Sequence, residues 1–235
     1  VYVWDEELSN VEMKIVTKSL RKELGGIPDL EPAGTVAVFP ISDLRAYYMR
    51  FILAVVPAQS INIFAEWDGS IVPDRVNGRY PVTLTAGSVK LTTSFRHGAG
   101  NRVTAMDGDY TTRLLWPDNS NPSVMTMCFV SRLVGLENKR ILQTYNSPNA
   151  PNMNRLYGHN AGKRGVVFIV DGWKTSEATT GILTDWLVMC TSTTSVLPTN
   201  IIIDQSNHGT ASTVQTVSTR LNVNYNGASD FQLHS

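Results

Sequence analysis

The chain has 235 residues, of which 42% are hydrophobic and 17% are charged. This length suits one large β domain, or a domain with a small additional lobe. Basic and acidic residues number 20 each, so the formal net charge is zero at pH 7. The balance argues against nucleic-acid binding and against docking to a membrane through a basic patch. It also leaves little charge repulsion between copies, which favours self-association.

The N-terminus does not show a signal-peptide pattern, because its first residues are aromatic and acidic. A processed chain would look the same. The longest apolar run, residues 46–57, is too short to span a bilayer and contains Arg50. We therefore expect no membrane insertion, and we interpret this run as one long buried strand or a pair of strands.

One helix is predicted, directly after the strand-like run VYVW. Ser9 and Glu12 have the spacing of a capping box, a pattern that starts many helices. Basic residues gather toward the far end, where they suit the helix dipole, and Gly25-Gly26 is expected to end the helix. The apolar residues that recur at helical spacing are Val11, Ile15, Val16 and Leu20.

Beyond a linker at residues 27–34, the chain is predicted to be nearly all β. Runs such as YPVTLT, SVKLTTSF, VMTMCFVSR and GVVFIV are separated by Gly, Pro, Asn and Asp. Many short strands beside a single helix indicate an antiparallel β-sandwich of the jelly-roll kind. We divide the chain into a strand and helix at 1–26, an additional β segment or small β lobe at 27–87, and the sandwich at 88–235.

The two cysteines, Cys128 and Cys190, each lie in a strand-like run. On the residues alone, two interpretations stay open. The cysteines are either two buried thiols or a disulfide, which would indicate an oxidising compartment. By the chain-entropy model, such a disulfide would contribute about 4 kcal/mol of stability at best.

The two ends of the chain, read head to tail, make one plausible segment, SDFQLHS followed by VYVWDEELSNVEM. This segment resembles the closing strand of laminin-G-like and pentraxin-like domains, in the concanavalin A-like lectin/glucanase superfamily. In that family the last strand ends in a Trp-Asp pair, followed by L-S-x-x-E and a short helix. The residues that fit are Val3, Trp4, Asp5, Leu8, Ser9 and Glu12, with Tyr2 in the same strand.

Other stretches resemble the same family in order. VMTMCFVSR and DWLVMC are similar to two neighbouring strands that pentraxins join covalently, so the resemblance implies a Cys128–Cys190 disulfide. RLYGHNAGKRGVVFIVDGW resembles a hairpin of laminin-G-like repeats in secreted protist and algal proteins. NIIIDQSNHGT resembles the strand with the family's Asp-Gly turn, although Gln follows the Asp here. The resemblance covers residues 88–235 and 1–25.

The order of these segments departs from the family, because the closing strand and helix stand at the N-terminus. Three explanations are open. The chain is a circular permutant whose first segment returns to its own sheet, or it is one unit of a longer tandem protein. Alternatively, residues 1–25 complete the sheet of the next copy by strand addition. This third hypothesis predicts self-assembly, and a filament if the contact does not close.

The sequence does not show a pattern typical of an enzyme. The glucanase branch of the fold needs three carboxylates, E-x-D-x-E, on one face of a strand. The nearest match, residues 66–70, lacks the third carboxylate and contains a hairpin-type Asp-Gly turn. The four histidines share no metal-ligand spacing. For a pentraxin-type Ca²⁺ site, the weak candidates are Asp107 and Asp109, for which we favour a turn-forming role. We expect no cofactor.

We therefore expect a non-catalytic structural or adhesive subunit of an extracellular or cell-surface assembly, with copies of itself as partners. Residues 2–5 and Leu8 would hold the assembly strand in place. The alternative function is a glycan-binding lectin module that uses the loops around His159 and Trp173. For His159 we favour a second interpretation, a residue that shapes its hairpin.

Overall fold

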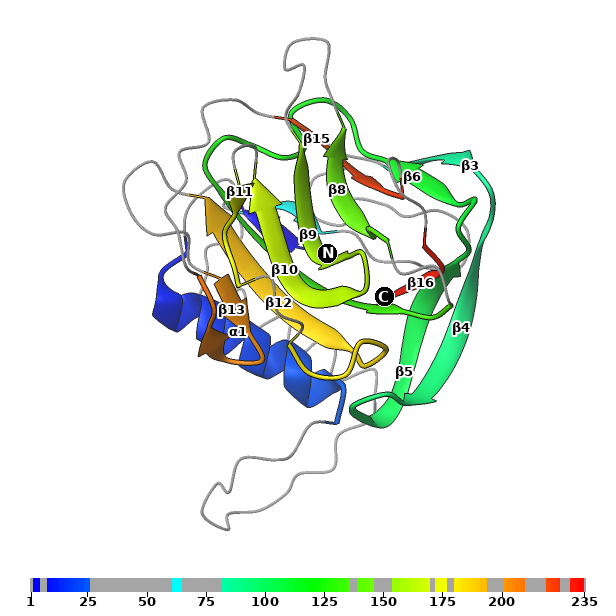
Figure 1. The fold of residues 1–235 in the computed structure, drawn as a ribbon, viewed down its shortest axis with the longest axis horizontal. Coiled ribbons are helices and arrows are strands. Elements are labelled where there is room, and N and C mark those ends of the chain that lie inside the picture. Colours follow the sequence, from blue (N-terminus) through cyan, green and yellow to red (C-terminus); the bar gives the residue numbers. More distant parts are fainter. Residues whose placement is uncertain are drawn as a thin grey trace.

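The residues that the computed structural model describes are 2–4, 8–25, 61–64, 82–135, 139–145, 154–169, 172–176, 180–193, 201–209, 219–224 and 229–234. They form two antiparallel sheets packed together and one short helix, which confirms the predicted all-β sandwich (Figure 1). Among these residues, no helix is long and apolar enough to cross a membrane.

The first sheet has nine strands and includes strands from both ends of the chain. Its strands are β1 (Tyr2–Trp4), β2 (Ile61–Phe64), β4 (Val89–Arg96), β5 (Ala99–Gly108), β7 (Met125–Leu133), β12 (Leu187–Thr193), β13 (Ile201–Ile203), β14 (Ser206–Asn207) and β16 (Phe231–His234). The main order is β14-β13-β12-β7-β16-β5-β4, while β1 pairs with β7 and β2 pairs with β1.

The second sheet has seven strands, in the order β11-β10-β9-β8-β15-β6-β3. They are β3 (Thr83–Ala86), β6 (Arg113–Leu115), β8 (Leu142–Tyr145), β9 (Arg155–Asn160), β10 (Lys163–Ile169), β11 (Gly172–Trp173) and β15 (Arg220–Val223). Strands β2 and β3 both belong to the segment 27–87, and they join the first and the second sheet respectively. Residues 27–60 and 65–81 of that segment, including the apolar run 46–57, lie outside the described residues.

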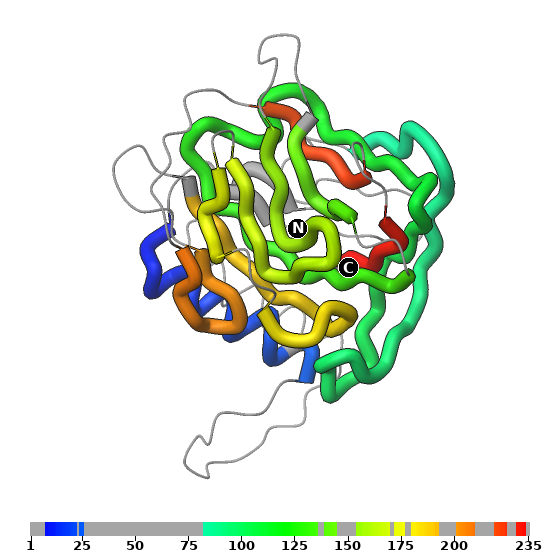
Figure 2. Tube along the Cα trace, viewed as in Figure 1, coloured from blue at the N-terminus to red at the C-terminus, as the bar shows by residue number. Residues whose placement is uncertain are grey.

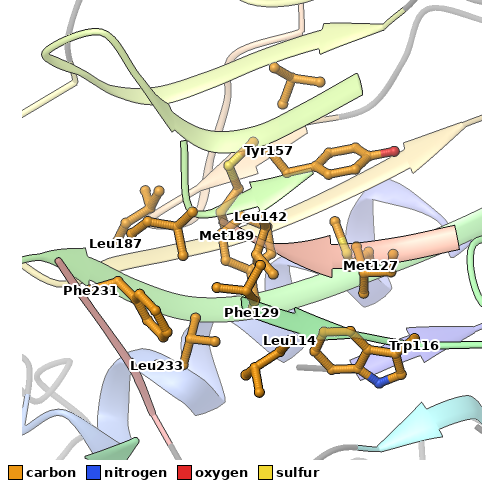
Figure 3. Close-up of a cluster of buried hydrophobic side chains, with 14 of the residues drawn as sticks. Leu114, Trp116, Met127, Phe129, Leu142, Tyr157, Leu187, Met189, Phe231 and Leu233 are labelled. Atoms are coloured by element: carbon orange, nitrogen blue, oxygen red, sulfur yellow. The ribbon is translucent and has the colours of Figure 1, made fainter. Parts of the chain in front are cut away.

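Strand β7 lies at the centre of the molecule, and all nine of its residues are buried. One face of β7 points into the core between the sheets, where Met127 and Phe129 join Leu142 and Tyr157 of the second sheet (Figure 3). The other face, which includes Cys128, belongs to a second hydrophobic cluster on the outside of the first sheet. Burial on both faces explains why this strand shows little polar alternation in the sequence.

The helix α1 (Asn10–Glu23) covers that outer cluster and lies against β7, β12 and β13 (Figure 1). Its capping box is confirmed. The backbone N–H of Ser9 donates to Glu12 Oε2 at 2.8 Å, and the N–H of Glu12 donates to Ser9 Oγ at 3.3 Å. Gly25 follows the helix with a φ of +69°, a left-handed conformation that suits glycine and ends the helix.

The buried face of α1 agrees with the predicted one at Val16 and Leu20 and differs from it at Val11. Val11 is 67% exposed, whereas Met13, Val16 and Leu20 are buried in the outer cluster. Residues 13, 16 and 20 lie on one side of a helix with 3.6 residues per turn. Val11 precedes Met13 by two positions, or about 200°, and so points to the opposite side. Apolar character alone does not distinguish the two sides, because only one of them meets the sheet.

Candidate assembly site

Strands from the two ends of the chain share one side of β7. Strand β16 pairs with residues 131–133 of β7, and β1 pairs with residues 126–128, both antiparallel. Only Phe129 and Val130 lie between the two paired stretches, so β16 and β1 run in one direction, end to end. Figure 2 shows the C-terminal segment, in red, beside the green strands that flank it. The prediction that the two ends make one segment is confirmed.

The same arrangement extends to the next row of the sheet. Strand β5 pairs with the far side of β16, and β2 pairs with the far side of β1. In this single chain, β1 is therefore flanked by strands of its own sheet, as the first of the three explanations expects. Of the predicted assembly strand, Tyr2, Val3 and Trp4 are described through their backbone pairing, and Asp5 lies outside the described residues.

Leu8 lies between β1 and the helix. It is buried, at 2% exposure. Its backbone N–H donates to Thr126 Oγ1 of β7 at 2.8 Å, and this bond is also buried. A buried backbone N–H needs a hydrogen-bond acceptor. Leu8 lies beyond β1, so the side chain of Thr126 supplies this acceptor in place of a strand carbonyl.

The apolar face of α1 packs on a set of apolar side chains on the outside of the first sheet. We call this set the helix groove. The helix segment contributes Leu8, Met13, Val16, Leu20 and Leu24. The sandwich contributes Ala99, Val103, Ala105, Cys128, Val130, Trp186, Val188, Cys190 and Ile202. Every one of these side chains is buried, so this part of the contact is apolar and derives its stability chiefly from water exclusion.

The floor of the helix groove contains the one disulfide of the chain. Cys128 of β7 and Cys190 of β12 stand directly opposite each other, with their Cα atoms 4.1 Å apart, and they are bonded. Both are fully buried. The disulfide that the resemblance implied is therefore confirmed, and Cys128 also faces Tyr2 of β1 on its other side.

A polar contact fixes the far end of the helix. Arg21 Nη1 lies 3.4 Å from the carbonyl oxygen of Trp186 and 3.8 Å from Asp204 Oδ1, in the turn after β13. The buried Arg164 of the second sheet approaches the same two groups, donating to the Trp186 carbonyl at 2.6 Å and lying 3.5 Å from Asp204 Oδ2. Arg164 also donates to the carbonyl of Thr180. The contact thus joins both sheets to the helix.

His159, one of the two candidate glycan-binding residues, lies inside the sandwich. It is fully buried on β9, and its Nε2 lies 3.2 Å from Ser131 Oγ of β7. Burial, with Arg164 nearby, lowers the pKa of His159 to about 3, so the ring is neutral at physiological pH. In this conformation the ring bridges the two sheets and offers no surface to a sugar.

Trp173, the other candidate, lies at the edge of the second sheet on β11 and is half-buried. Its ring meets Phe168 edge-to-face, with centroids 5.4 Å apart, and Lys163 Nζ lies 5.2 Å from its centroid. The structure does not bring Trp173 and His159 to one surface, because one is at a sheet edge and the other is in the core.

The two candidate Ca²⁺ ligands have separate roles. Asp107 Oδ2 of β5 accepts from Gln232 Nε2 at 2.8 Å, and Gln232 Oε1 accepts in turn from Arg132 Nε at 2.7 Å. Asp109 caps its own turn, where hydrogen bonds from Thr111 lower the pKa of its carboxyl. In the part of the chain that the structure describes, no three His, Cys, Asp or Glu residues gather as metal ligands.

Several residues of this site were not singled out in the sequence. Met13 follows the spacing of the buried helix face and could have been found from the pattern 13, 16, 20. Thr126, Arg164 and Asp204 could not, because each acts on a partner more than 20 residues away in the chain. For Arg21, which is one of the basic residues near the end of the helix, the sequence indicates only an interaction with the helix dipole. The sequence matches no known protein family, and it matches no curated protein.

Proposed function

We propose that this protein is a non-catalytic structural or adhesive subunit of an extracellular or cell-surface assembly. In that assembly residues 1–25 of one copy complete the first sheet of the next copy. We also propose that the sandwich is of the concanavalin A-like, laminin-G-like kind, on the sequence resemblance. The observation that carries the assembly proposal is the end-to-end arrangement of β16 and β1 along β7.

Exchange of the segment between copies would keep every contact that now holds it. These contacts are the backbone ladder to β7, the apolar face of α1 in the helix groove, and the approach of Arg21 to Trp186 and Asp204. None of them depends on which chain supplies the segment. Strand addition of this kind takes affinity from main-chain hydrogen bonds and specificity from side-chain pockets. A head-to-tail contact of this type propagates unless its rotation closes a ring.

Charge and redox chemistry are compatible with this setting. The chain has no net charge at pH 7, which keeps the repulsion between neighbouring copies small. The Cys128–Cys190 disulfide is of a type that persists in oxidising compartments. The first observation supports self-association, and the second supports an extracellular setting.

The test is the mass of the protein in solution over a hundredfold concentration range, from about 0.01 to about 1 mM, which approaches the millimolar effective concentration of a segment on a short flexible tether. The chain is compared with Val16→Asp, which places a charge in the helix groove, and with Val11→Asp. Val11→Asp is the matched control, because Val11 lies on the exposed side of the same helix. We expect the average mass to rise with concentration for the unmodified chain and for Val11→Asp only.

A mixing experiment adds a second criterion. A Val16→Asp chain keeps its own groove but cannot donate its segment, so a small proportion of it should shorten the species formed by the unmodified chain. Unmodified protein that stays monomeric over the whole range, with its segment folded back, would refute the proposal.

The second candidate function is glycan binding at the edge of the second sheet. The observation in its favour is the group of Trp173, Phe168 and Lys163, since half-buried aromatic rings with a polar neighbour are suited to stack on sugar rings. A glycan array should then give a signal that Trp173→Ala removes. Phe95→Ala, a change at an exposed aromatic residue of β4, should leave the signal intact. No signal from the unmodified chain would exclude the glycans tested.

A further inference from the structure

We infer that the docked N-terminal segment controls chemical access to the Cys128–Cys190 disulfide, so that a small thiol reduces this bond only after residues 1–25 have left the groove. The shielding follows from the packing of one chain and holds whichever copy supplies the segment. Its consequence for assembly rests on the proposed function.

Different parts of the molecule enclose the disulfide on each of its sides. Within the sheet, Cys128 is flanked by Cys190 on one side and by Tyr2 of β1 on the other. On the outer face, both cysteines belong to the cluster that α1 closes with its buried side chains. On the inner face lies the core between the two sheets, including Met127 and Met189.

Of these covers, we infer that the N-terminal segment opens first, because its apolar side chains from Leu8 to Leu24 pack in the outer cluster and not between the sheets. It is held by the pairing of the short strand β1 with β7 and β2, by one helix face and by the contact of Arg21. Two backbone groups add to this: the N–H of Leu8 donates to Thr126, and the carbonyl of Leu24 accepts from the N–H groups of Gly100 and Asn101. The central strands β7 and β12, by contrast, contribute Met127, Phe129, Leu187 and Met189 to the core between the sheets. Local opening of one structural unit costs less free energy than global unfolding, so release of the segment should be the first event that exposes the sulfurs.

The reduction itself is ordinary thiol–disulfide exchange. The thiolate of a small thiol attacks one protein sulfur, the S–S bond breaks, and a mixed disulfide forms while the second protein sulfur leaves as a thiolate and takes a proton from water. A second thiol, which in dithiothreitol belongs to the same molecule, then attacks the mixed disulfide and leaves two protein thiols and the oxidised reagent as a disulfide. Each attack needs access to a sulfur that is now fully buried.

For an assembly built by segment exchange, this gives redox control of growth. A groove filled by a neighbour's segment is protected, whereas an empty groove at the growing end exposes its disulfide. Reduction there removes the covalent tie between β7 and β12, two of the strands that receive the incoming segment. Reducing conditions should therefore act on empty acceptor sites before they act on filled ones.

The test measures how fast dithiothreitol reduces the disulfide in the native full-length chain, with free thiols trapped by iodoacetamide and counted by intact mass. We expect Val16→Asp to be reduced at least tenfold faster than the unmodified chain, and Val11→Asp to match the unmodified chain. We also expect the reduction rate of the unmodified chain to depend on urea less steeply than global unfolding does, because the opening exposes less surface. A folded Val16→Asp chain that is reduced at the unmodified rate overturns the inference. A urea dependence equal to that of global unfolding does so as well.

A milder variant covers the case in which Val16→Asp does not fold. Arg21→Ala removes the contact with Trp186 and Asp204 and leaves the apolar face intact, and it should raise the reduction rate several-fold, with Lys22→Ala as control. The mass of each sample separates the two proposals. A monomer whose disulfide is protected by the segment supports the shielding and refutes assembly. If the mass rises with concentration but the variants are reduced at the same rate as the unmodified chain, the result supports assembly and refutes the shielding.

Discussion

Mild acid should destabilise this fold through His159, although its ring bears no charge in the native state. The imidazole is fully buried between the sheets, and its Nε2 lies 3.2 Å from Ser131 Oγ. Its Nδ1 has no hydrogen-bond partner among the described residues. Burial first, and the nearby Arg164 second, lower the pKa of His159 from 6.5 to about 3. The native structure therefore resists protonation at a site that the unfolded chain protonates readily.

The sign of the effect follows from that difference. Below pH 6.5 the unfolded chain gains a proton at His159 and the folded chain does not, so unfolding becomes more favourable as the pH falls. The stability contribution is fully present above about pH 6.5 and is lost progressively toward pH 3. Each pH unit in that window changes the free energy of unfolding by about 1.4 kcal/mol. At about pH 5 the expected loss from this one residue is about 2 kcal/mol.

The assay is urea unfolding, followed by tryptophan fluorescence, at several values between about pH 7.5 and about pH 5. The unmodified chain is compared with His159→Gln, which keeps a hydrogen-bonding side chain beside Ser131 and does not titrate. His97 and Asp109, whose pKa values are also lowered, are present in both chains, so their effects cancel in the difference. The unmodified chain should lose about 2 kcal/mol more than the variant over this range. Parallel pH profiles for the two chains would refute the reasoning.

Three further changes test the helix and the groove. Ser9→Ala removes the N-cap of α1 and should lower the free energy of unfolding by about 1 kcal/mol, while an unchanged melting temperature would contradict the observed capping box. Met13→Ala should lower the free energy of unfolding by about 2–5 kcal/mol. Val11→Ala, on the exposed side of the helix, should lower it by less than about 0.5 kcal/mol. Urea unfolding that ranks the two variants in the reverse order would contradict the packing described. Replacing Cys128 and Cys190 together by alanine should cost up to about 4 kcal/mol in non-reducing urea unfolding, and no loss would mean that the bond does not constrain the chain.

The parts of the structure that could be predicted are those that depend on residues close together in the sequence. Ser9 and Glu12 stand three positions apart, and that spacing alone specifies a capping box. Short apolar runs separated by turn residues indicated the sandwich in the same way. The disulfide came from the resemblance of two strand sequences, and it holds because β7 and β12 are neighbours with Cys128 and Cys190 in register.

The parts that could not be predicted depend on which surfaces meet. Val11 and Met13 are both apolar, and only the position of the sheet decides that Met13 is buried. Asp107 and Asp109 have the spacing of two residues on one strand face. Strand β5 ends at Gly108, however, so Asp109 turns away and caps its own turn. The approach of Arg21 to Asp204 spans most of the chain, and local sequence does not encode such a pair.

The end-to-end arrangement of β16 and β1 also sets the conditions under which copies would associate. Because the exchanged segment makes the same contacts in either chain, the contact free energy cancels between the folded-back and the donated form. The choice then depends on the effective concentration of the chain's own segment, which for a short flexible tether is in the millimolar range. Below that concentration a freely tethered segment returns to its own groove. Assembly at micromolar concentration would therefore mean that the connection to the sandwich disfavours self-docking, and the concentration at which the mass begins to rise measures that bias directly.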